Sequence, residues 1–70
     1  MRIDIATVEG NTTNALTIAS RFLMEAGAAP GYILDMKRDV FNAQSAEAAR
    51  RVIEERTGGG VSFFNSACGG

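Results

Sequence analysis

Histidine is absent from this chain, and cysteine occurs once, at position 68. Without histidine, no Ser–His or Cys–His pair can activate a nucleophile, and the usual ligand set of a zinc site is missing. A single cysteine forms no internal disulfide. Adjacent carboxylates occur only at Glu54 and Glu55, which would face different directions on a helix. We therefore expect a non-enzymatic protein without a metal or other cofactor.

Excess charge and long apolar runs are also lacking. Seven basic residues stand against eight acidic ones, a net charge of −1, so the chain has no broad basic stripe for nucleic acid. No apolar run is long enough for a membrane span. Asp4 stands where the apolar core of a signal peptide would begin. These absences predict a cytoplasmic protein with no membrane contact.

The chain is short for a stable fold. Seventy residues make one domain, and the apolar fraction of 46% is typical of a folded protein. A core of this size barely offsets the entropy of ordering the chain, and neither a disulfide nor a zinc ion is expected to help. We therefore expect the protein to associate with another protein, with itself as a homodimer, or with both.

The strongest periodic signal is an amphipathic helix over residues 14–26. Asn11, Thr12 and Thr13 are all candidate N-caps, and Thr12 or Thr13 is favoured; Gly27 suits the end of the helix, and Pro30 prevents its continuation. Its apolar residues recur every three or four positions, and the predicted buried arc is Ala15, Ile18, Ala19, Phe22, Leu23 and Ala26, with Leu16 at its edge. The alternation in residues 2–8 predicts a strand before this helix.

The second half of the chain predicts a similar succession. Residues 32–37 are interpreted as a strand. The sequence does not decide whether Lys37 and Arg38 form a turn or lie in mid-strand. A helix over residues 46–57 follows, capped by Ser45, and then a strand over 61–65. The predicted fold class is α/β or α+β in β-α-β-α-β order, with two helices on one face of a roughly three-stranded sheet. Residues 1–65 would be the domain, and 66–70 a flexible tail.

Protein–protein contact is the leading functional hypothesis. The outer arc of the first helix carries only one charge, and one of two adjacent phenylalanines must point away from the core if 61–65 is a strand. The candidate interface residues are Thr17, Ser20, Arg21, Met24 and Phe64. Small proteins of this make-up serve as regulators, inhibitors or assembly subunits, so a phage-type inhibitor of a host or defence complex is a concrete possibility.

Two alternatives stay open. The basic pairs Lys37–Arg38 and Arg50–Arg51 would serve a small dimeric nucleic-acid-binding regulator. Separately, Gly69–Gly70 resembles the diglycine tail of ubiquitin-like sulfur carriers, whose terminal carboxylate is activated as an adenylate or thiocarboxylate. That family begins with a β-hairpin before its helix, whereas one strand is predicted here.

Overall fold

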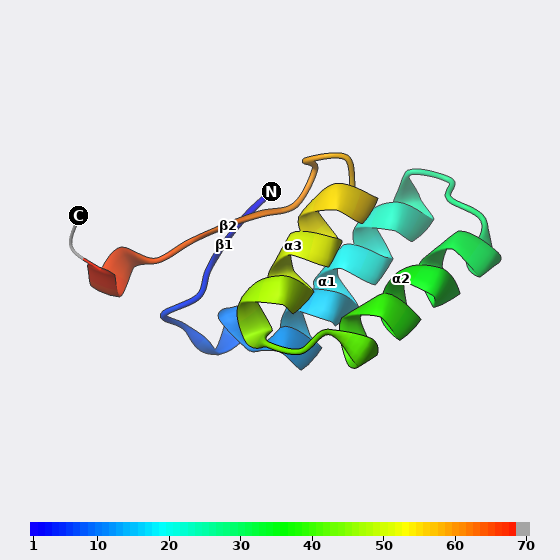
Figure 1. Cartoon of the computed structure of the whole chain (residues 1–70). Coiled ribbons are helices and arrows are strands. Elements are labelled where there is room, and N and C mark those ends of the chain that lie inside the picture. The colour runs from blue at the N-terminus through cyan, green and yellow to red at the C-terminus, as the bar shows by residue number, and fades with distance from the viewer. Residues whose placement is uncertain (69–70) are drawn as a thin grey trace.

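Three helices and a small pair of strands make up the fold (Figure 1). The computed structural model describes residues 1–68, apart from the side chains of Glu9 and Cys68. The elements in chain order are β1 (Arg2–Asp4), the 3-10 helix η1 (Val8–Gly10), α1 (Thr12–Glu25), α2 (Pro30–Asn42), α3 (Ala46–Arg56), β2 (Ser62–Phe64) and the 3-10 helix η2 (Ser66–Cys68). Each of the helices α1, α2 and α3 contacts the other two, so they enclose one core.

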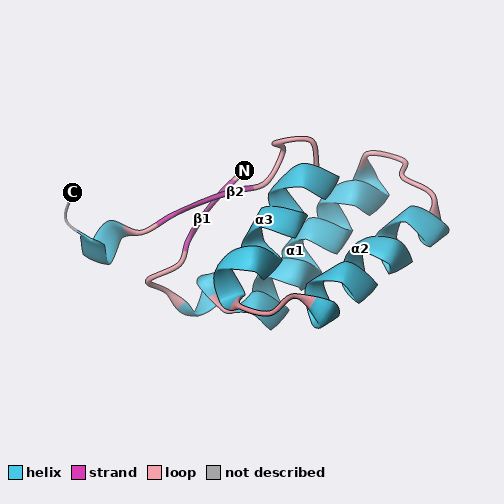
Figure 2. Ribbon diagram, viewed as in Figure 1, coloured by secondary structure: helices cyan, strands magenta, loops and turns pink. Residues whose placement is uncertain are grey.

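The predicted fold class is wrong. The described residues contain three helices rather than two, and their only sheet is the parallel pair of β1 and β2 rather than three strands in β-α-β-α-β order (Figure 2). Arg2 lies opposite Ser62, and Asp4 lies opposite Phe64. Because these two strands belong to opposite ends of the chain, all three helices form the connection between them.

The error lies in residues 32–37, which belong to α2 and not to a strand. Ile33, Met36 and Val40 are the buried side chains of α2, and their spacing of three and four residues is helical. Pro30 begins this helix. It occupies the first turn of α2, where a missing N–H costs nothing. The basic pair that begins at Lys37 therefore lies in mid-helix, in neither of the two positions considered.

Both helices that the sequence predicted are confirmed to within two residues at each end. Ser45 caps α3 as predicted, and its hydroxyl accepts a hydrogen bond from the Ala48 amide at 3.1 Å. The cap of α1 is Asn11 rather than Thr12 or Thr13, because the Asn11 side chain accepts from the Thr13 amide at 2.9 Å. Local side-chain chemistry thus determines where these helices begin.

The buried side of α1 differs from the predicted arc. Leu16 and Ser20 are buried, whereas Ile18 and Phe22 are only partly covered and Ala26, just after the helix, is exposed. The reason is α2, which packs beside Leu16 and Ser20 and was not expected to be a helix. The full buried set of α1 is Ala15, Leu16, Ala19, Ser20 and Leu23.

The strand predicted over residues 2–8 ends early, at Asp4. The Asp4 carboxylate accepts the Ala6 amide at 2.9 Å, and the Thr7 amide donates to the Asp4 carbonyl at 3.1 Å, which turns the chain. The same carboxylate accepts the Ser66 hydroxyl at 2.6 Å and the Ser66 amide at 3.3 Å. Asp4 therefore connects β1 to η2. Gly69 and Gly70, the rest of the tail predicted to be flexible, lie outside the described residues.

The Asp4–Ser66 contact predicts a measurable effect of pH. The Ser66 hydroxyl, followed by the Ala6 amide, lowers the pKa of the Asp4 carboxyl below its ordinary value of 3.8. A carboxyl whose pKa falls on folding stabilises the fold above its unfolded pKa and loses that contribution as pH falls through the lower folded value. Ser66→Ala should move the pKa of Asp4 back toward 3.8. Carboxyl-carbon NMR titration of Asp4 in both proteins measures this, and an identical pKa would refute the assignment.

Candidate functional site

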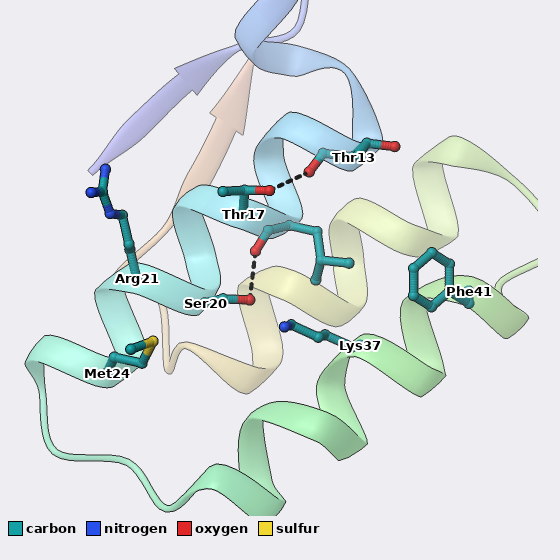
Figure 3. A pocket seen from close by; sticks show the side chains of 8 residues that line it. Thr13, Thr17, Ser20, Arg21, Met24, Lys37 and Phe41 are labelled. Atoms are coloured by element: carbon teal, nitrogen blue, oxygen red, sulfur yellow. Dashed lines mark hydrogen bonds between the residues drawn. The ribbon is translucent and has the colours of Figure 1, made fainter.

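Two open hollows adjoin each other between α1 and α2, with volumes of about 440 Å³ and 390 Å³. Met24 and Lys37 line both hollows. The two hollows therefore form one continuous feature, which we call the α1–α2 groove. Figure 3 shows the larger hollow. The residues that line the groove are Thr13, Leu16, Thr17, Ser20, Arg21, Met24, Ala28, Pro30, Ile33, Leu34, Lys37 and Phe41.

Two of the hydroxyl groups that line the groove, those of Thr17 and Ser20, are bonded within α1. Thr17 donates to the Thr13 carbonyl at 3.1 Å, and Ser20 donates to the Leu16 carbonyl at 2.8 Å (Figure 3). Each bond reaches back one turn along the same helix. These two hydroxyl donors therefore do not need a ligand.

Exposed apolar side chains gather along the groove. Met24 is 66% exposed, Leu34 61% and Phe41 75%. Single exposed apolar residues are ordinary on a protein surface, but several along one groove are typical of a binding surface. Of the six large apolar side chains exposed in the described part of the chain, these three line the groove, and the others are Met1, Val8 and Tyr32.

The charged groups that line the groove are both cations. Lys37 extends from α2 toward Ser20, whereas Arg21 points outward from the edge of α1 (Figure 3). Within residues 1–68, the ion pairs are Arg51–Glu47, at 3.5 Å, and Arg56–Asp39. Among the side chains that the structure describes, Lys37 and Arg21 thus have no carboxylate partner, and no carboxylate lines the groove.

Four of the five candidate interface residues lie together. Thr17, Ser20, Arg21 and Met24 all line the larger hollow, although Ser20 is largely buried there instead of exposed on an outer face. Phe64 lies elsewhere, on β2, with the Arg2 guanidinium 4.6 Å from its ring centroid. The sequence interpretation missed the other wall of the groove, where Leu34, Lys37 and Phe41 lie on α2. Their spacing of three and four residues was the available signal.

The two basic pairs proposed for nucleic acid belong to different surfaces. Lys37 lines the groove, and Arg38 is exposed beside it in sequence on α2. Arg51 lies on α3 and pairs with Glu47 of the previous turn. Arg50, also on α3, is partly covered. A continuous basic stripe would need these four side chains on one face, and Lys37 and Arg51 line separate hollows.

Other kinds of site find little support in the described residues. No three potential metal-binding side chains cluster among them. None of the helices within residues 1–68 is both long and apolar enough to cross a membrane. The sulfur-carrier alternative depends on Gly69 and Gly70, which lie outside that part of the chain.

Comparison with family models, with curated proteins and with solved structures finds no match to this chain. The α1–α2 groove is therefore interpreted from its own geometry and chemistry.

Proposed function

We propose that this protein is a small, non-enzymatic protein-binding module, and that the α1–α2 groove is its contact surface. The observation that carries the proposal is the exposure of Met24, Leu34 and Phe41 along one groove. Methionine adapts its shape to a partner, and aromatic residues are enriched where proteins meet. Inhibitors, regulators and assembly subunits all act by such contact, and inhibition of a host or defence complex is one form of it.

A capture experiment with groove variants tests the proposal. The tagged full chain would be expressed in its native host and crosslinked, alongside the triple variant Met24→Ala, Leu34→Ala, Phe41→Ala. Alanine keeps the helices intact and removes the exposed apolar groups, so partner recovery should fall by about tenfold or more, as when interface anchors are truncated.

Val8→Ala is the matched control, because Val8 is 78% exposed but lies on η1, outside the groove. This variant should retain the partner. Equal recovery by the wild type and the triple variant, or no partner recovered specifically by the wild type, would contradict the proposal. Circular dichroism melts of all variants verify that the fold is kept.

A further inference from the structure

We infer that the occupant of the α1–α2 groove is an acidic amphipathic helix of a different protein. This inference rests on the proposed function and specifies the partner's chemistry. The groove combines an apolar surface with two cations, Lys37 and Arg21, that have no carboxylate partner within residues 1–68. A complementary segment supplies apolar side chains on one face and carboxylates beside them.

The walls of the groove favour a helix over an extended strand. Both walls are helices, whose backbone amides and carbonyls are bonded within each helix, so an added strand would find no row of free backbone groups. α1 has 14 residues and is therefore about 21 Å long at 1.5 Å per residue. A helix of three to four turns matches that length and places apolar residues every three or four positions along the groove.

The charge of the groove also separates this occupant from a second copy of the chain. In a two-fold dimer built on this surface, both sides would contribute Lys37 and Arg21, and neither side would contribute a groove carboxylate. The acidic residues of α2, Asp35 and Asp39, are each two positions from Lys37 and so point away from it, and Asp39 pairs with Arg56 of α3. Like charges facing each other disfavour that arrangement.

Three synthetic peptides provide the test. Each is a four-turn helix with the same apolar residues at helical spacing, and the flanking positions are all Glu, all Gln or all Lys. Each is titrated into the isotope-labelled full chain at low salt and followed by amide NMR shifts. We expect shifts centred on Met24, Leu34 and Lys37, with the Glu peptide bound about tenfold more tightly than the Lys peptide, and with this difference shrinking at high salt.

Charge reversal in the groove sharpens the result. Lys37→Glu should remove or invert the preference for the Glu peptide. Arg38→Glu is the matched control, since Arg38 is exposed on the same helix but does not line the groove, and it should preserve the preference. Equal binding of all three peptides, or binding of none, overturns the inference.

A second copy of the chain must also be distinguished from a different protein as the occupant of the groove. Sedimentation equilibrium that shows a dimer in the wild type and a monomer in Phe41→Ala would assign the groove to a second copy and overturn the inference. The proposed function would survive any of these failures if groove-dependent capture of a partner is still observed. Conversely, the triple variant could recover the partner as well as the wild type while the Glu peptide still binds more tightly than the Lys peptide. That result would contradict the proposed function and leave the charge preference of the groove intact.

Discussion

Gly10→Ala is expected to destabilise the protein by about 1–3 kcal/mol, the range of strained insertions into a packed site. Gly10 is buried at the end of η1, against the backbone of Ile5. An added Cβ would overlap the Ile5 Cα and lie 2.8 Å from the Asp4 carbonyl oxygen. Backbone cannot rotate away as a side chain can, so η1 or β1 must shift. Urea unfolding followed by circular dichroism measures the change.

Gly31→Ala provides the opposite expectation in the same protein. Gly31 lies in the first turn of α2, its φ is not positive, and an added Cβ meets nothing within 4 Å. Alanine restricts the unfolded chain and favours the helix, so stability should rise by about 0.4–1 kcal/mol. If the two substitutions had similar effects, the close approach of Gly10 to Ile5 would be wrong.

Met36→Ala should cost about 2–5 kcal/mol, whereas Leu34→Ala should change stability by less than about 0.5 kcal/mol. Met36 is fully buried, and its truncation leaves a cavity among the three helices. Leu34 is 61% exposed in the α1–α2 groove, where alanine removes few contacts. Denaturant unfolding of both variants gives the two free energies.

The comparison of Met36 with Leu34 also distinguishes the observed helix from the predicted strand. In a strand, residues two apart share a face, so both truncations would be costly or both harmless. In a helix, positions two apart face nearly opposite sides, so only one is costly. Equal effects of the two truncations would therefore contradict the assignment of residues 30–42 to α2.

Much of the fold could be predicted from local sequence. Asparagine or serine caps begin α1 and α3, and glycines at positive φ, Gly27 and Gly58, follow their ends. Such signals act within one turn of the chain, so a single sequence reveals them. The one helix that was missed, α2, has no side-chain cap hydrogen bond, and its N-cap residue is Ala29.

The sequence of α2 misled for a second physical reason. Leu34 and Phe41 are exposed, so apolar residues occur on more than one side of the helix and blur its period. The helical period becomes clear only when Ile33, Met36 and Val40 are recognised as the buried set. Exposed apolar residues thus obscured both the element and the groove wall that it forms. The α1 wall was easier to find because its outer arc carries little charge.

The pairing of β1 with β2 has a consequence for the order of folding. Arg2 and Ser62 are partners in this parallel ladder although sixty positions separate them in the chain. Contacts within and between successive helices close short loops, whereas this pairing must close nearly the entire chain, at a larger entropic cost. We therefore expect the helices to assemble first and the strands to join last. Slowed folding should follow from changes in the helical core, whereas weakened strand pairing should mainly speed unfolding.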